Sequence, residues 1–263
     1  MKINTTVDQL YESITNALNS KTPFSFLRCG DGDTIILQPE KKEWAERYAR
    51  VSRRNIGYVL EKNDGIQVKK NLERAICTAD ILGIAEIKHI KKNIYWGSQH
   101  EILENVLLEN RTNISDRRYC TLDAHLHLLE KSYLDKILQS TRRIVIITAR
   151  DVQKSIQKKF TNIDQIEFHK IPAEVHFEDT FKLSDFYPDI HRSIVQKIKS
   201  EDRNGQLCLF GAGFIGKNFG SEFKKMGGVA MDIGSVFDLW DGKQTRGPNR
   251  DKNAITTEFL LNK

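Results

Sequence analysis

The stretch Phe24-Ser-Phe-Leu-Arg-Cys-Gly-Asp-Gly-Asp33 joins a short apolar run directly to an acidic, glycine-rich turn. Pro23 precedes the run and Gly30 follows it, a pattern typical of a buried strand that ends in a tight loop. Two carboxylates, Asp31 and Asp33, come just after the carboxyl end of this strand. Ligands of open α/β sheets bind at that edge. The acidic turn is therefore the first candidate site, and the strand is the first element of the fold.

Six further segments are candidate strands, and helical patterns lie between several of them. The predicted strands are residues 81–85, 119–122, 143–148, 166–169, 207–210 and 229–233. Among the predicted helices are residues 125–138 and 190–198. Strands that alternate with helices form βαβ units. We therefore expect an α/β fold of Rossmann-like type, with a mainly parallel sheet and helices on both faces.

The amino-terminal region begins with an amphipathic helix. Apolar residues recur at helical spacing from Val7 to Leu18, and Thr6 with Gln9 resembles a capping box. No repeat or Pro/Gly/Ser linker divides the chain, so we expect one domain over residues 1–263. Residues 87–118 are the least regular part, and we interpret them as an inserted helical or substrate-facing segment.

Composition and charge exclude several classes of protein. The chain has 263 residues, with 41 Lys+Arg against 35 Asp+Glu, a formal net charge of +6 that favours anionic partners or simply a solvated surface. Its four cysteines form no CxxC pair, which argues against structural zinc and a disulfide scaffold. No apolar run is long enough to span a membrane. We expect a cytoplasmic protein, with electrostatic attachment to the inner membrane face left open.

The carboxylates of Asp31 and Asp33 are hard oxygen ligands two residues apart. On a loop, such a pair can share Mg²⁺ or Mn²⁺, which then accepts oxygens from a substrate diphosphate. Gly30 and Gly32 would let the backbone turn and a phosphate approach closely. The alternative is a solvated turn, since Asp and Gly are common turn residues.

A second glycine-rich turn, Gly211-Ala-Gly-Phe-Ile-Gly-Lys217, follows the apolar run 207–210. Gly211 and Gly213 fit a GxGxxG motif between a strand and a helix, where backbone N–H groups favour an anion, and Lys217 adds a cation. Asp232 follows Gly211 at about the offset of the ribose-binding acid in dinucleotide folds. An NAD(P)-dependent oxidoreductase is therefore a competing hypothesis, although too few residues follow the turn for a complete dinucleotide domain. Strand-to-helix packing is the other reading of these glycines.

Three segments together resemble the GT-D fold glycosyltransferases. Residues 24–33 are similar to the Arg-x-Gly-Asp-Gly-Glu stretch that carries the family's DXE motif. Ile171-Pro-Ala-Glu-Val-His-Phe177 is similar to the family's Ile-Pro-x-x-Asn-Ala-Phe, and Gly227-Gly-Val-Ala-Met-Asp-Ile-Gly234 to its Gly-x-x-Ala-x-Asp-Ile-Gly-His. The chain departs from the family at three places, with Asp33 for Glu, Val175-His176 for Asn-Ala, and Ser235 for the closing His.

The resemblance implies transfer of a sugar from a nucleotide diphosphate donor, with a UDP-sugar as the expected donor. The acceptor would be a glycan, a glycoprotein or a lipid-linked glycan in the assembly of a bacterial surface polysaccharide or glycoprotein. Asp31 and Asp33 would be the catalytic residues and would hold Mn²⁺ or Mg²⁺. The expected donor-binding residues are Arg28, Gly30, Gly32, Gly211, Gly213, Lys217, Asp232 and Ser235. The candidates for the base or for acceptor contacts are Glu174, His176, Trp240 and Arg246.

Other residues point less clearly to chemistry. His125 and His127 lie two apart in a predicted helix and so face different sides, which argues against a shared metal. Basic pairs are dispersed and lack interleaved aromatic residues, so we expect no specific nucleic-acid partner, and a basic nucleic-acid-binding module is the third hypothesis. No GxSxG or HExxH motif is present. The sequence leaves the acceptor, the stereochemistry and the oligomeric state open.

Overall fold

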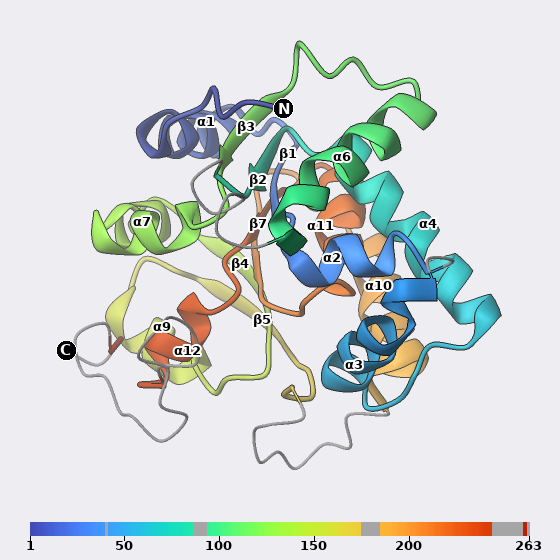
Figure 1. Cartoon of the computed structure of the whole chain (residues 1–263). Coiled ribbons are helices and arrows are strands. Elements are labelled where there is room, and N and C mark those ends of the chain that lie inside the picture. Colours follow the sequence, from blue (N-terminus) through green and yellow to red (C-terminus); the bar gives the residue numbers. More distant parts are fainter. Residues whose placement is uncertain (40–41, 87–93, 175–184, 244–259, 262–263) are drawn as a thin grey trace.

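Seven parallel strands form a single sheet in the computed structural model of the chain (Figure 1). The structure describes residues 1–39, 42–86, 94–174, 185–243 and 260–261. The strands are β1 (Phe24–Arg28), β2 (Ile81–Ile84), β3 (Arg118–Thr121), β4 (Arg143–Thr148), β5 (Gln165–Lys170), β6 (Leu207–Phe210) and β7 (Val229–Asp232). Their order across the sheet is β3-β2-β1-β7-β6-β4-β5.

This order places the first strand, β1, beside the last strand, β7, at the centre of the sheet. β1 pairs in parallel with β2, with Phe26 opposite Ile81, and on its other side with β7, with Phe24 opposite Val229. β6 is the next strand along. The carboxyl ends of β1, β6 and β7 therefore lie side by side, although β1 is far from the other two in sequence.

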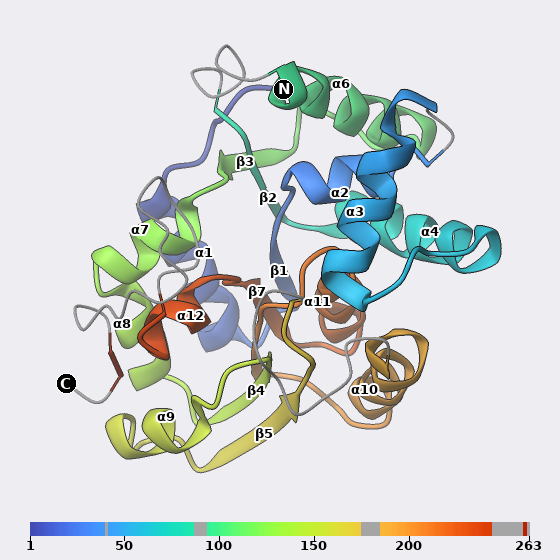
Figure 2. The ribbon, with the colours of Figure 1, turned by 60° about the horizontal axis from the view of Figure 1, so that its bottom comes forward.

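Helices cover both faces of the sheet (Figure 2). One face carries α1 (Val7–Ser20), α7 (Ala124–Glu130), α8 (Tyr133–Gln139), α9 (Gln153–Lys159) and α12 (Val236–Trp240). The other carries α2 (Asp31–Ile36), α3 (Ala45–Ile56), α4 (Lys62–Thr78), α6 (Ile94–Glu109), α10 (His191–Lys199) and α11 (Gly216–Lys225). Short helical turns are η1 (Lys42–Trp44) and η3 (Phe186–Ile190). Within the described residues, no helix is long and apolar enough to cross a membrane.

The strand side chains alternate between two hydrophobic cores, one on each face. In β4, for example, Val145 and Ile147 pack in one core, whereas Ile144 and Ile146 pack in the other. This alternation follows from the period of two in a strand. Because both faces are buried, each strand can be apolar throughout, which explains why the sequence shows continuous apolar runs.

The predicted α/β class, the parallel sheet and all seven strands are confirmed. The Thr6 capping box is also present. The prediction of one helix over residues 125–138 was wrong, because Ser132 takes a left-handed conformation with φ of 56° and separates α7 from α8. In the segment 87–118, the described part contains α6, which connects β2 to β3, and residues 87–93 lie outside the described residues.

Helix α11 packs unusually close to the sheet. A Cβ at Gly220 would lie 2.7 Å from Leu27 Cδ2 and 2.9 Å from Phe210 Cζ, closer than such atoms normally approach. Glycine at this position therefore lets the helix lie directly on β1 and β6. The same close packing fixes where Lys217, one turn earlier on α11, enters the space beyond the strand ends.

We predict that Gly220→Ala will lower the free energy of unfolding by about 1–3 kcal/mol, because the added methyl group overpacks a buried contact. Chemical denaturation of wild type and variant measures the change. Lys225→Ala, on the exposed side of the same helix, is the control and should leave the midpoint unchanged. Wild-type stability of Gly220→Ala would contradict the close packing.

Candidate active site at the strand ends

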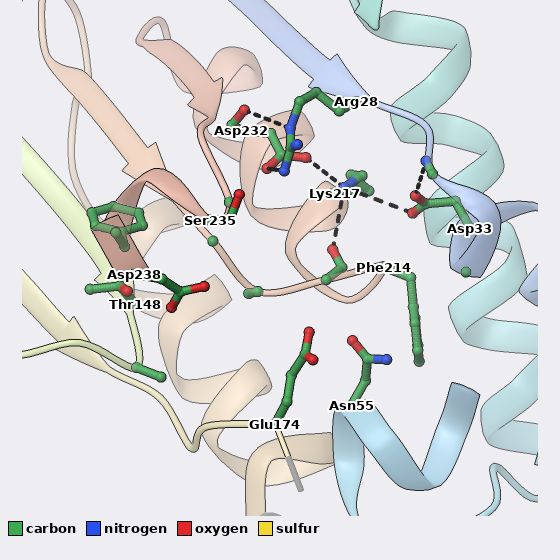
Figure 3. A pocket seen from close by; sticks show the side chains of 18 of the residues that line it. Arg28, Asp33, Asn55, Thr148, Glu174, Phe214, Lys217, Asp232, Ser235 and Asp238 are labelled. Atoms are coloured by element: carbon green, nitrogen blue, oxygen red, sulfur yellow. Dashed lines mark hydrogen bonds and ion pairs between the residues drawn. The ribbon is translucent and has the colours of Figure 1, made fainter. Parts of the chain in front are cut away.

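A cavity of about 390 Å³ opens beyond the carboxyl ends of the strands (Figure 3). Its lining comes from the residues that end or follow six of the seven strands, so segments distant in sequence contribute to one space. Representative lining residues are Arg28 after β1, His125 after β3, Arg150 after β4, Glu174 after β5, Gly211 after β6 and Asp232 at the end of β7. The position agrees with the ligand-binding edge expected for an open α/β sheet.

Four charged side chains form a buried cluster at one wall of this cavity. Asp232 Oδ2 accepts a hydrogen bond from Lys217 Nζ at 2.6 Å, and Asp232 Oδ1 accepts one from Arg28 Nη2 at 3.1 Å. Asp33 Oδ1 lies 3.8 Å from Lys217 Nζ. The acidic turn near the amino terminus and the glycine turn near the carboxyl terminus therefore meet in one place (Figure 3).

The cluster shifts the ionisation of its members. Burial alone would raise the pKa of Asp232, but the charges of Arg28 and Lys217 outweigh it and hold the pKa at about 2. Burial alone would lower the pKa of Lys217, but Asp232 and Asp33 raise it. Burial raises the pKa of Asp33, and Lys217 only partly offsets this. Asp232 is thus firmly ionised and Lys217 charged, whereas Asp33 takes up a proton more readily than an ordinary aspartate.

The acidic residues lie on a helix rather than on the loop that the sequence predicts. Gly30 is the N-cap of α2, and its backbone N–H donates a hydrogen bond to Asp33 Oδ2 at 2.7 Å. The other oxygen, Asp33 Oδ1, is buried without a hydrogen-bond partner among the described residues. Asp33 is therefore held by one oxygen and keeps the second one for another partner.

The shared metal expected for Asp31 and Asp33 does not fit this geometry. Residues two apart on a helix do not face each other; Asp33 is buried, whereas Asp31 is exposed and its Oδ1 accepts from Gly32 N–H at 2.9 Å. The charge of the Lys217 ammonium, 3.8 Å from Asp33 Oδ1, disfavours a second cation at this oxygen. No group of three His, Cys, Asp or Glu in the described part of the chain is arranged to hold a metal ion. We derive no step through a metal.

The glycine turn 211–215 runs from β6 into α11 and borders the cavity. Gly213 has φ of 56°, and a Cβ there would overlap Asn55 Oδ1, so this position requires glycine. A Cβ at Gly211 would lie 2.9 Å from the carbonyl oxygen of Gly234. Within the described residues, the backbone N–H groups of 212–215 have no backbone acceptor. The glycines thus have packing reasons, and the turn also presents free donors at a helix N-terminus.

The acceptor and base candidates are placed less favourably. Glu174 borders the cavity, but its Oε2 accepts a hydrogen bond from Arg54 Nε at 2.6 Å, so its carboxylate is already paired. Trp240 is only 3% exposed and packs edge-on against Phe237, and it is not among the lining residues. The expectation that Trp240 contacts the acceptor therefore does not fit its buried position. His176 and Arg246 lie outside the described residues.

The remaining predicted donor-binding positions all border the cavity. They are Gly30, Gly32 and Ser235. Neither Gly30 nor Gly32 has to be glycine for steric reasons, because a Cβ at either position would make only ordinary van der Waals contacts. Ser235 Oγ lies 3.3 Å from His125 Nε2. The imidazole of His125 therefore lies beside Ser235, the position at which the family motif has its closing His.

Sequence reasoning missed several residues of the site. His125 is buried and contacts Arg28, while His127 is half exposed, so the two rings do face different sides as predicted. Arg150 and Asp238 form a nearly buried ion pair of 2.6 Å across the cavity wall. Their position within a few residues of the carboxyl end of a strand was the available signal. What the sequence could not show was which of the many polar residues at those ends point inward.

The pairing of Asp232 bears on the dinucleotide hypothesis. In that reading, an acidic residue at the end of the next strand binds the ribose hydroxyls. Here both carboxylate oxygens of Asp232 are engaged by Lys217 and Arg28, and the residue is 2% exposed. The carboxylate that the NAD(P) hypothesis requires for the ribose is therefore already paired with two cations of the protein.

Comparison with known proteins agrees with this architecture. The family model described as a GT-D fold-like domain matches residues 5–240. The chain therefore belongs to the GT-D-like family, and it is a glycosyltransferase by fold. No curated protein matches it.

Two solved structures show the same fold. One, described as the highly conserved domain of unknown function 1792 with a distinct glycosyltransferase fold, has a TM-score of 0.54 and 12% identity, covering 98% of this chain and 88% of that one. The other, described as a new glycosyltransferase (DUF1792) from Streptococcus sanguinis, has a TM-score of 0.52 and 13% identity, covering 96% and 91%. The expected GT-D fold is confirmed, and the low identity agrees with a divergent member.

The buried pairing predicts a specific pH dependence of stability. The pKa of Asp232 is depressed from 3.8 to about 2. The ionised carboxylate therefore adds to the free energy of unfolding at all pH values above 3.8, and this added stability is lost as the pH falls from 3.8 through 2. We expect Asp232→Asn to lower the free energy of unfolding by about 2 kcal/mol at pH 7 and by progressively less toward pH 3. Urea unfolding at a series of pH values measures this.

The control for that experiment is Asp164→Asn, which removes a carboxylate whose ion pair with Arg142 is exposed. It should change the stability little at any pH. A destabilisation by Asp232→Asn that stays constant from pH 7 to pH 3 would contradict the assigned ionisation.

Proposed function

We propose that this chain transfers a sugar from a nucleoside-diphosphate donor, with a UDP-sugar as the first candidate, to a hydroxyl group of an acceptor. The observation that carries the proposal is the meeting of Asp33 with Lys217, 3.8 Å apart, at the wall of a strand-end cavity that the 211–215 turn also borders. Membership of the GT-D-like family supports it. A diphosphate donor needs such a combination of anion-binding backbone and nearby cations.

The diphosphate would bind at the turn 211–215. Free N–H groups and the dipole at the N-terminus of α11 favour an anion there. Breaking the bond between the sugar and the diphosphate develops negative charge on the leaving phosphate. Lys217 and Arg28 are held in fixed positions by Asp232, so their charges would act on the leaving group without rearrangement.

Asp33 would bind a sugar hydroxyl. Its Oδ1 lacks a hydrogen-bond partner among the described residues, and the residue lines the cavity. A hydroxyl group of the donor sugar or of the acceptor supplies the missing donor. Because burial raises the pKa of Asp33, this carboxylate is also better suited than an ordinary aspartate to receive a proton.

The family resemblance supports a proposal for the biological setting. We propose that the acceptor is a glycan, a glycoprotein or a lipid-linked glycan, and that the reaction belongs to the assembly of a bacterial surface glycan. All four cysteines are free, which supports a reducing compartment. We therefore place the enzyme in the cytoplasm, working at the inner face of the membrane when its acceptor is lipid-linked.

Ligand screening tests the proposal directly. We expect UDP or another nucleoside diphosphate, and the corresponding nucleotide sugars, to raise the melting temperature, and one nucleotide sugar to be hydrolysed or transferred. Each donor is tested with Mn²⁺ and with a chelator. The comparison ligands are NAD, NADP and a random oligonucleotide. A shift with the nicotinamide cofactors alone, or tight salt-sensitive binding of the oligonucleotide alone, would overturn the proposal.

A matched pair of variants then tests the role of Asp33. We expect Asp33→Asn to reduce donor turnover at least about 100-fold, because it would remove the carboxylate that we propose to bind the reacting sugar, and Asp31→Asn to have a much smaller effect. Melting temperatures show whether each variant is folded. An equal, large loss in both variants would favour a metal shared by the two carboxylates and contradict the arrangement on α2.

A further inference from the structure

Arg28 lies in a space that two glycines leave open. A Cβ at Gly234 would overlap Arg28 Nη2, and one at Gly83 would lie 3.2 Å from Arg28 Cγ. Gly234 also has φ of 44°, a conformation that disfavours any other residue. The backbone of β2 and of the loop after β7 therefore provides room for the guanidinium at one position beside the cavity.

The hydrogen bonds of Arg28 leave part of its guanidinium unused. Nε donates to the carbonyl oxygen of Asp232 at 3.1 Å, and Nη2 donates to Asp232 Oδ1 at the same distance. Nη1 lies 2.7 Å from Nε2 and 3.1 Å from Nδ1 of His125. A guanidinium has five N–H groups, and a neutral imidazole accepts through one ring nitrogen only. Two N–H groups, one on each terminal nitrogen, therefore have no acceptor among the described residues. Arg28 borders the cavity and remains partly accessible.

The partner at Nη1 must be a neutral imidazole. A guanidinium can only donate, so the nitrogen of His125 that faces it must carry a lone pair. Burial and the charge of Arg28 both lower the pKa of His125 well below its ordinary value, in agreement with a neutral ring. Ser235 Oγ is 3.3 Å from the same nitrogen. His125 therefore connects α7 with β1 and with the loop after β7.

A neutral acceptor has a specific advantage here. A carboxylate in its place would orient the guanidinium but would also cancel its positive charge, and a protonated imidazole would repel it. Arg28 already shares the Asp232 carboxylate with Lys217. A neutral imidazole fixes the direction of its N–H groups without adding a second negative charge, so the cluster keeps its cationic character toward an anion in the cavity.

We propose that His125 is a positioning residue, whose neutral imidazole holds Arg28 so that its two unused N–H groups bind the donor diphosphate. The inference rests on the proposed glycosyltransferase function, because it assigns the anion to the donor. It predicts that an uncharged hydrogen-bond acceptor at position 125 is what donor binding requires, rather than an aromatic ring that fills the space.

The test compares UDP binding by calorimetry to wild type, His125→Phe and His125→Gln. We expect His125→Phe to weaken binding about tenfold or more, because Arg28 loses an orienting hydrogen bond, and His125→Gln to remain within about threefold of wild type. His127→Phe, on the same helix but half exposed, is the control and should bind UDP as wild type does. Equal affinities for all the variants, or equal losses in both folded His125 variants, would overturn the inference.

A measurement on the wild type makes the test independent of whether His125→Phe folds. The ¹⁵N chemical shifts of the His125 ring should show a neutral imidazole at pH 7, and they should change when UDP is added. A protonated ring, or shifts that UDP leaves unchanged while it binds, would overturn the inference alone. If wild type binds neither UDP nor any other nucleoside diphosphate, the proposed function falls as well.

Discussion

The site depends on one carboxylate shared by two cations. Asp232, at the end of β7, binds Arg28 from β1 and Lys217 from α11, residues that are respectively 204 and 15 positions away in the chain. Buried charges are costly unless they are paired with good geometry. The pairing therefore favours one relative placement of β1, β7 and α11. That placement brings Asp33 beside Lys217, so that the turn 211–215 and helix α2 border the same cavity.

Much of the fold could be predicted because the sheet is buried on both sides. Continuous apolar runs marked the central strands, shorter or mixed patterns marked β3 and β5, and the alternation of these segments with helices indicated a parallel sheet. The strand order could not be read from local patterns, because it depends on which elements pair across long sequence separations. The break at Ser132 was missed since both flanking segments keep a helical apolar pattern, and only a left-handed backbone at one residue separates them.

The candidate site was predicted in part. Residues at strand ends were identified correctly as neighbours, because parallel strands share one edge. The acidic turn was misread as a loop, since Gly30 caps a helix and Asp33 bonds back to it. The importance of His125 depends on Arg28, which comes from another strand, and no local spacing reveals such a contact. Trp240 shows the opposite error, because an aromatic ring near a strand end can equally well belong to the core.

The most direct measurement is a crystal structure of the protein with a nucleoside diphosphate bound. The account predicts that the diphosphate lies in the strand-end cavity, with its oxygens at the backbone of residues 211–215 and near Arg28 and Lys217, and that Asp232 keeps both ion pairs. A diphosphate bound elsewhere on the molecule, or one that displaces Asp232 from the two cations, would contradict it.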